Sequence, residues 1–262
     1  MVRRPLGNHH HGPETLLVTS DTTQTDVVAT QTENLRKAID RARFVLFDFD
    51  GPVCRLYAGH AAERVARDLV EWLERQGMRG LLTREERDHP DPLAVLHAVD
   101  RRRPRSDLVA ELEARFTQQE LKAVDKAWPT EYADALIRTW TAVGVRLAIT
   151  TNNSPLTAAR YLDGRGLADC FTPHIYGRTQ DLRHLKPDPN CLNRALSALG
   201  AAPSQALMIG DTTSDLHAAE GAGVPFLGYA RNKEREEQLR KAGAEHVVDS
   251  LETVLRVLRG RS

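Results

Sequence analysis

The fold is decided by the stretch Phe44-Val45-Leu46-Phe47-Asp48-Phe49-Asp50-Gly51, in which an apolar run leads into two closely spaced acids and a glycine. The apolar run predicts a buried strand. Because side chains alternate along an extended chain, Asp48 and Asp50 point to the same side, and Gly51 lets the chain turn away sharply. Acids at the end of a buried strand favour a chemical role, one as a nucleophile and the other as a proton carrier.

Composition excludes several classes of protein. The chain has 262 residues, enough for one large domain or two smaller ones. Its 36 Lys and Arg balance 36 Asp and Glu, so the formal net charge is zero, with no global attraction to nucleic acid or an anionic membrane. The three cysteines form no C-x-x-C pair, which suggests neither a disulfide framework nor a zinc site.

Targeting signals are also lacking in the sequence pattern. No apolar stretch approaches the roughly 20 residues of a membrane-spanning helix, and no apolar segment follows Arg3 and Arg4, as a secretory signal would require. We therefore expect a reduced, cytoplasmic protein that binds neither nucleic acid nor membrane. The sequence gives no indication of the oligomeric state.

The amino-terminal half shows two kinds of segment. Residues 1 to about 34 have no sustained period, which predicts a mostly disordered leader, with a short strand at 16–18 as an alternative. Residues 57–130 have helical periodicity and no strand candidate. Asp91, for example, is a suitable N-cap for a helix that starts at Pro92.

From Tyr132 onward, apolar strands alternate with helices. Strands are expected at residues 145–150, 174–176, 206–209, 225–229 and 246–248. This alternation predicts a parallel sheet with helices on both faces, and the helical block interrupts it after the first strand. We therefore expect a doubly wound, Rossmann-like α/β core (35–56 and 131–262) with an inserted all-helical cap (57–130). Ligands of such sheets bind at the carboxyl ends of the strands.

Four polar clusters follow one another, each after an expected strand or before an expected helix. They are Asp48-Phe49-Asp50-Gly51, Ile149-Thr150-Thr151-Asn152-Asn153, Lys186-Pro187-Asp188-Pro189 and Gly210-Asp211-Thr212-Thr213-Ser214-Asp215. Each motif alone is weak, but the ordered set is specific. Over about residues 43 to 258 the chain resembles the haloacid dehalogenase-like (HAD) superfamily, most of all the capped branch that contains phosphoglycolate phosphatase-type enzymes.

The charges of these clusters require cations. If Asp48, Asp50, Asp211 and Asp215 converge, up to four negative charges share a cleft, and a phosphate dianion adds two more. Unit charges about 4 Å apart repel by roughly 4 kcal/mol at an effective dielectric near 20. Lys186 supplies one positive charge, and a hard, oxygen-seeking ion such as Mg2+ suits the rest.

The resemblance implies catalytic roles for five residues. Asp48 would be the nucleophile that forms an aspartyl-phosphate, and Asp50 would protonate the leaving oxygen and then deprotonate the hydrolytic water. Thr151 would hydrogen-bond a phosphoryl oxygen, together with the backbone amide of Asn152. Lys186 would neutralise charge on the phosphoryl group and on the nucleophile.

The resemblance also implies a Mg2+ site. Asp211 would ligate the ion together with one oxygen of Asp48 and the backbone carbonyl of Asp50. Asp215 would either support the metal through water or hold Lys186. Apart from the resemblance, it could also simply cap the helix that follows, since Asp is a favoured cap residue. We therefore expect a Mg2+-dependent phosphatase that hydrolyses a small phosphorylated metabolite, with the cap shaping substrate selection.

Two other functions stay open at this point. A phosphomutase on the same scaffold would pass the phosphoryl group back to a sugar, and a non-catalytic binding or scaffold protein would keep only the fold. The intact set of motif residues argues against the second. Asp50 disfavours dehalogenase chemistry, since the dehalogenases of the superfamily lack an acid there.

Some residues near the motifs leave substrate choice open. Pro52 stands where the superfamily commonly has Thr or Val, and it fixes φ and removes a backbone donor. Arg55, Arg178, Arg183 and His184 are either contacts for a second anionic group of the substrate or ordinary surface residues.

Overall fold

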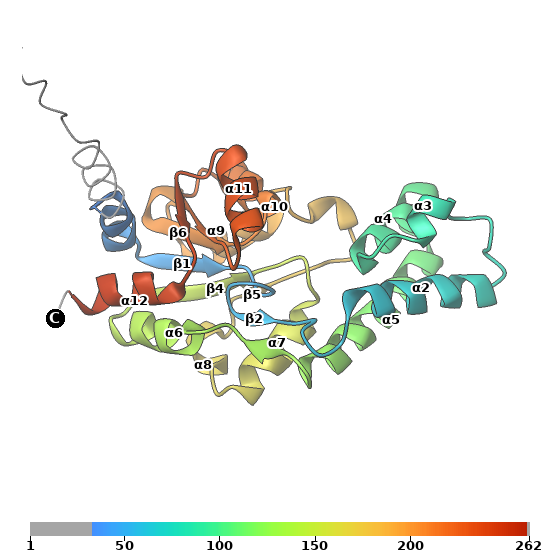
Figure 1. The fold of residues 1–262 in the computed structure, drawn as a ribbon, viewed down its shortest axis with the longest axis horizontal. Coiled ribbons are helices and arrows are strands. Elements are labelled where there is room, and N and C mark those ends of the chain that lie inside the picture. Colours follow the sequence, from blue (N-terminus) through green and yellow to red (C-terminus); the bar gives the residue numbers. More distant parts are fainter. Residues whose placement is uncertain (1–32, 261–262) are drawn as a thin grey trace, which may run out of the picture.

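A computed structural model describes residues 33–260 of the chain (Figure 1). Most of the expected leader, including the alternative strand at 16–18, lies outside these residues. The first described residues, 33–41, are helical, which agrees with a structured core that begins near residue 34. Leu35 and Ile39 of this helix are buried in the main core, which explains why the segment is ordered.

The core is a six-stranded sheet with the order β5-β4-β1-β6-β7-β8, in which every neighbouring pair is parallel. The strands are β1 (Phe44–Phe47), β4 (Arg146–Thr150), β5 (Ile175–Tyr176), β6 (Ala206–Gly210), β7 (Phe226–Tyr229) and β8 (His246–Val248). The chain runs outward from central β1 to β4 on one side and to β6 on the other. A ligand crevice is expected where the strand order reverses, at the carboxyl end of β1.

Strand β1 supplies both hydrophobic cores because its side chains alternate. Val45 and Phe47 belong to one buried cluster, and Phe44 and Leu46 belong to the other. Helices lie on opposite sides of the sheet in Figure 1. They are α6 (Ala133–Ala142), α7 (Pro155–Gly164), α8 (Ala168–Phe171) and α12 (Leu251–Arg259) on one side, and α9 (Asn190–Leu199), α10 (Thr213–Ala222) and α11 (Lys233–Lys241) on the other. The predicted doubly wound α/β fold is confirmed.

A helical insertion follows β1, as the sequence predicts. Its helices are α2 (Ala62–Arg75), α3 (Arg84–Arg87), α4 (Pro92–Arg102) and α5 (Asp107–Val124). Helices α2, α4 and α5 share a hydrophobic cluster of their own that includes Leu69, Leu96 and Phe116. Asp91 caps α4, its carboxylate accepting a hydrogen bond from the amide of Leu93 at 2.8 Å. The insertion extends to one side of the sheet (Figure 1).

A short ribbon at the root of the insertion was not predicted. Strand β2 (Cys54–Arg55) pairs antiparallel with β3 (Trp128–Pro129), where the chain leaves and rejoins the core. The expectation of no strand within 57–130 is therefore wrong at β3. Two residues are too few to show a period. Short 3-10 turns, η1 (Leu182–His184) and η2 (Pro203–Gln205), complete the secondary structure. Among residues 33–260, no helix is long and apolar enough to cross a bilayer.

Candidate active site

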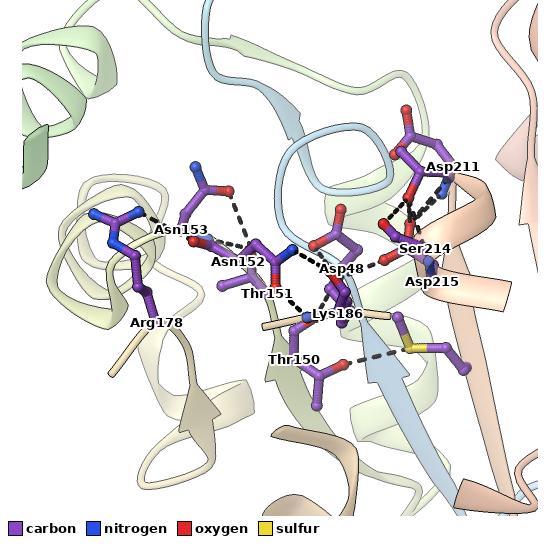
Figure 2. A network of polar contacts seen from close by, with 12 residues as sticks. Asp48, Thr150, Thr151, Asn152, Asn153, Arg178, Lys186, Asp211, Ser214 and Asp215 are labelled. Atoms are coloured by element: carbon purple, nitrogen blue, oxygen red, sulfur yellow. Dashed lines mark hydrogen bonds and ion pairs between the residues drawn. The ribbon is translucent and has the colours of Figure 1, made fainter. Parts of the chain in front are cut away.

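The four sequence clusters meet at the carboxyl ends of β1, β4 and β6, and Lys186 lies at their centre (Figure 2). Its Nζ donates hydrogen bonds to Oδ1 of Asp48 at 2.7 Å, to Oδ1 of Asp215 at 2.5 Å and to the carbonyl of Thr150 at 2.9 Å. Lys186, Asp48 and Asp215 are all buried. The four clusters come together, and the ammonium group binds two acids from different elements, Asp48 just after β1 and Asp215 in the first turn of α10.

Two glycines allow the acids to approach so closely. Gly51 has φ +127°, and a Cβ there would lie 2.5 Å from Cγ of Asp211. A Cβ on Gly210 would overlap the side chain of Asp215. Any side chain at either position would push one of these acids out of the site.

The turn after β1 accommodates Pro52 without losing a hydrogen bond that the turn uses. The amide of Gly51 donates to the carbonyl of Cys54 at 2.7 Å, and the amide of Cys54 donates to the carbonyl of Phe49 at 3.1 Å. The donors of this turn thus lie on either side of the proline.

Asp211 is the residue best placed to bind a cation. Its Oδ1 is buried and has no hydrogen-bond partner. Carboxylate oxygens of Asp48, Asp211 and Asp215 all lie within 4.8 Å of one another. Burial, and then the neighbouring carboxylates of Asp215 and Asp48, raise the pKa of Asp211 well above its usual value. A hard divalent ion would relieve this repulsion, so the residues present fit Mg2+.

Asp215 belongs to this group of acids, but both of its carboxylate oxygens already accept hydrogen bonds. Its Oδ1 accepts from Lys186, and its Oδ2 accepts from the amide of Asp211 at 3.1 Å and from the amide of Thr212 at 3.0 Å. Asp215 also completes a capping box at the start of α10. Of the two roles expected for it, holding Lys186 fits this geometry better than ligating a metal.

Asp48 and Asp50 have different environments. Burial raises the pKa of Asp48 to about 6, although the contact with Lys186 acts in the opposite direction. Burial raises the pKa of Asp50 to about 7, against the hydrogen bond from the amide of Leu56 at 2.8 Å. Burial alone would lower the pKa of Lys186, but Asp215 and Asp48 raise it above its usual value, so the ammonium stays charged.

The loop after β4 carries Thr151 and Asn152. The hydroxyl of Thr151 is buried and donates to Oδ1 of Asn153 at 3.0 Å. Asn152 is bound to Lys186 in both directions: its Nδ2 donates to the Lys186 carbonyl at 3.0 Å, and its Oδ1 accepts from the Lys186 amide at 2.8 Å. The side chain of Asn152 therefore fixes the loop that carries the lysine.

Arg178 and Glu120 form a buried ion pair that the sequence did not reveal. Nη2 of Arg178 lies 2.9 Å from Oε2 of Glu120, and both side chains are fully buried. Nη1 of Arg178 also donates to the carbonyl of Asn152 at 3.1 Å. Glu120, in α5, accepts from Nδ2 of Asn153 at 2.8 Å and from the amide of Ser154 at 3.1 Å. The pair therefore joins the insertion to the loop after β4.

Both earlier interpretations of Arg178, as a surface residue or a substrate contact, are wrong. The signal for Glu120 was weak but present, because it follows Phe116 by one helical turn on the buried face of α5. A glutamate on an apolar helical face implies a buried partner.

A cavity of about 240 Å3 opens onto these groups. Its walls come from the strand-end loops and from the insertion, which contributes Asp91, Leu93, Phe116 and Glu120. A larger hollow of about 590 Å3 lies at the opposite ends of β6, β7 and β8 and contains none of the predicted site residues. The smaller cavity is therefore the candidate active site.

Comparison with known proteins agrees with this geometry. The haloacid dehalogenase-like hydrolase family matches residues 42–223, and the chain belongs to this family. A phosphoglycolate phosphatase of Neisseria gonorrhoeae is 30% identical over 204 residues, which cover 74% of this chain and 82% of that protein. A phosphoglycolate phosphatase of Rhodospirillum rubrum is 41% identical over 101 residues, which cover 37% of this chain and 41% of that protein.

A solved structure shares the fold. The crystal structure of a predicted phosphatase from Clostridium acetobutylicum superposes with a TM-score of 0.62 at 18% identity, covering 83% of this chain and 98% of that chain. The predicted membership of the HAD superfamily, near its phosphoglycolate phosphatase-like branch, is confirmed. The chain is an HAD-like hydrolase, and its phosphatase relatives support the expected class of phosphoric monoester hydrolase.

Proposed function

We propose that the protein is a Mg2+-dependent phosphatase that hydrolyses a small phosphomonoester through an aspartyl-phosphate on Asp48. One observation carries the proposal: the buried Lys186 binds Asp48, next to Asp50 with its raised pKa and Asp211 with its unpartnered oxygen. A scaffold that had lost catalysis would not need this combination of buried charges, each of which is unfavourable to bury.

The residues divide the work into two steps. A carboxylate oxygen of Asp48 attacks phosphorus in line, and Asp50 gives its proton to the departing alcohol oxygen. Water then attacks the phosphorus of the aspartyl-phosphate, Asp50 takes a proton from this water, and phosphate and the free carboxylate result. Lys186 holds Asp48 in position and offsets negative charge, and Thr151 donates its hydroxyl hydrogen to a phosphoryl oxygen.

The metal would be held by Asp211, by one oxygen of Asp48 and by the backbone carbonyl of Asp50. When bound, Mg2+ would neutralise the phosphoryl oxygens and the carboxylates that crowd them. Asp215 would contribute by orienting Lys186.

We further propose that residues 57–130 act as a cap over the core formed by 35–56 and 131–262. The candidate cavity is lined by both parts. Closure of the cap would exclude bulk water and select the alcohol portion of the substrate.

The first test of this proposal is metal dependence. The purified protein with Mg2+ is expected to release inorganic phosphate from an aryl phosphate, and EDTA is expected to abolish the release. Mg2+ is also expected to raise the melting temperature in the absence of substrate, because it binds the folded acid cluster and not the unfolded chain. Interconversion of sugar phosphates with little free phosphate would instead identify a phosphomutase. An inactive protein with no Mg2+ shift would support the scaffold interpretation.

The pH dependence tests the role of Asp50. A general acid must be protonated, so kcat/KM for an alkyl phosphate is expected to fall as pH rises above about 7, the pKa of Asp50 in the metal-free protein. Bound Mg2+ would favour the charged carboxylate and shift this limb to lower pH. An aryl phosphate has a good leaving group that needs no proton, so its kcat/KM should not show this fall at alkaline pH. If both substrates share the same alkaline limb, Asp50 is not the general acid.

A further inference from the structure

The cavity wall opposite the catalytic acids indicates what kind of alcohol the substrate contains. On the insertion side, Leu93 and Phe116 provide an apolar surface, and Asp91 and Glu120 provide carboxylates. Glu120 is paired with Arg178, whose guanidinium also binds Glu113 at 2.9 Å, so this group of three side chains offers no free positive charge. Asp91 has no salt-bridge partner within the described part of the chain, so it places one negative charge at this wall.

The lysine at the cavity wall is already bound to acids of the protein. Among the described residues that line it, Lys186 is the only Lys or Arg, and its ammonium binds Asp48, Asp215 and the Thr150 carbonyl. The amino end of α4 could attract an anion through its dipole. That end is capped by Asp91 itself, whose carboxylate accepts the amide hydrogen of Leu93.

The arginines considered as anion contacts lie elsewhere. Arg55 stacks over the ring of Trp128, with its Cζ 5.3 Å from the ring centroid, and Arg183 forms an exposed ion pair with Asp181. The side chain of Arg178 is fully buried and is held in its ion pairs, so it cannot reach a ligand in the cavity. Arg231, which is exposed, acts electrostatically on Asp50, and the half-buried Arg235 acts on Asp211, on the proposed metal side. Neither side chain lines the cavity.

We infer that the substrate is a phosphomonoester of an alcohol without a second anionic group, and that an alcohol carrying an amine is bound better than one carrying a carboxylate. The inference rests on the proposed phosphatase function. A carboxylate near Asp91 would be repelled, and no described residue that lines the cavity offers a free cation to offset this repulsion, whereas an ammonium group would pair with Asp91. Phosphoglycolate, which names the curated relatives, is by this argument a poor substrate here.

Three phosphomonoesters of equal chain length test the inference: phosphoethanolamine, 2-hydroxyethyl phosphate and phosphoglycolate. With the full-length protein and Mg2+, kcat/KM is expected to be about tenfold or more higher for the amine than for the carboxylate, with the neutral alcohol between them. A ratio near one, or a preference for phosphoglycolate, would overturn the inference while leaving the phosphatase proposal intact.

The variant Asp91→Asn isolates the charge, because Asn keeps the N-cap hydrogen bond of α4. It is expected to reduce the ratio of amine to carboxylate by roughly threefold to tenfold, the effect of one nearby charge at moderate dielectric. The matched control is Glu111→Gln, at an exposed acid of α5 that does not line the cavity, and it should leave the ratio unchanged. Equal shifts in both variants would mean that Asp91 has no specific role.

A binding measurement separates failure of the inference from failure of the proposed function. Calorimetric titration of Asp48→Asn with each phosphomonoester and Mg2+ reports affinity without turnover. Tighter binding of phosphoethanolamine supports the inference even if wild-type protein hydrolyses no phosphate ester, an outcome that would overturn only the phosphatase proposal. Equal or tighter binding of phosphoglycolate contradicts the inference.

Discussion

Asp48→Asn is expected to reduce phosphate release by at least roughly a thousandfold, because the amide cannot serve as the attacking group. Asp48 lies at the end of β1 with one oxygen 2.7 Å from the ammonium of Lys186. Asn is close to it in size and can still accept a hydrogen bond, so the loss is chemical rather than steric. Phosphate release from aryl and alkyl phosphates, measured at saturating Mg2+, checks this expectation.

The control for this variant is Asp188→Asn, which makes the same chemical change in the third sequence cluster. Asp188 is exposed, and its carboxylate accepts from the amide of Asn190, as an Asn can. Activity within about twofold of wild type is expected. In wild type, acid quenching during turnover should trap a phosphate on Asp48, detectable by mass spectrometry. Substantial activity in Asp48→Asn, or a phosphoryl group at another residue, would refute the mechanism.

The sequence predicted the sheet because its strands are strongly apolar. Strand β1 is buried on both faces, so it appears as the continuous run Phe44 to Phe47 rather than as an alternating pattern. The strand-end clusters could be placed together without coordinates, because parallel strands direct their carboxyl ends to one edge of a sheet. Lys186 could be predicted as a site residue only through the family resemblance, because a lysine before a proline is not distinctive by itself.

The features that the sequence did not reveal depend on tertiary contacts. The ribbon of β2 and β3 forms because the insertion begins and ends at the same place, which no local period encodes. The pairing of Glu120 with Arg178 joins residues far apart in the chain, so the position of Glu120 on the apolar face of α5 could suggest a buried partner without identifying Arg178. The role of Asp215 could not be decided from the sequence for a related reason. Only the structure shows that one of its carboxylate oxygens accepts from Lys186 and the other from the amide of Asp211.

Arg178→Met is expected to destabilise the protein by about 3–5 kcal/mol, because it leaves Glu120 buried without its partner. Arg178 is also packed under the ring of Phe116, with its Cζ 4.3 Å from the ring centroid, so methionine keeps much of the apolar contact. The free energy of unfolding by urea measures the effect. In the fraction that remains folded, kcat/KM should also fall, because the carbonyl of Asn152 loses its donor and the loop beside Thr151 loosens.

The exposed pair of Arg183 with Asp181 provides the matched control. Arg183→Met removes the same kind of side chain from a partner at the surface and should change the free energy of unfolding by less than about 1 kcal/mol. The double variant Arg178→Met/Glu120→Gln removes both buried charges and should recover at least about 1 kcal/mol relative to Arg178→Met. If Arg178→Met and Arg183→Met destabilise equally, the buried pair does not anchor α5 to the catalytic loop. If only the buried pair matters, the pair fixes the carboxyl-terminal part of α5 to the core through the loop after β4.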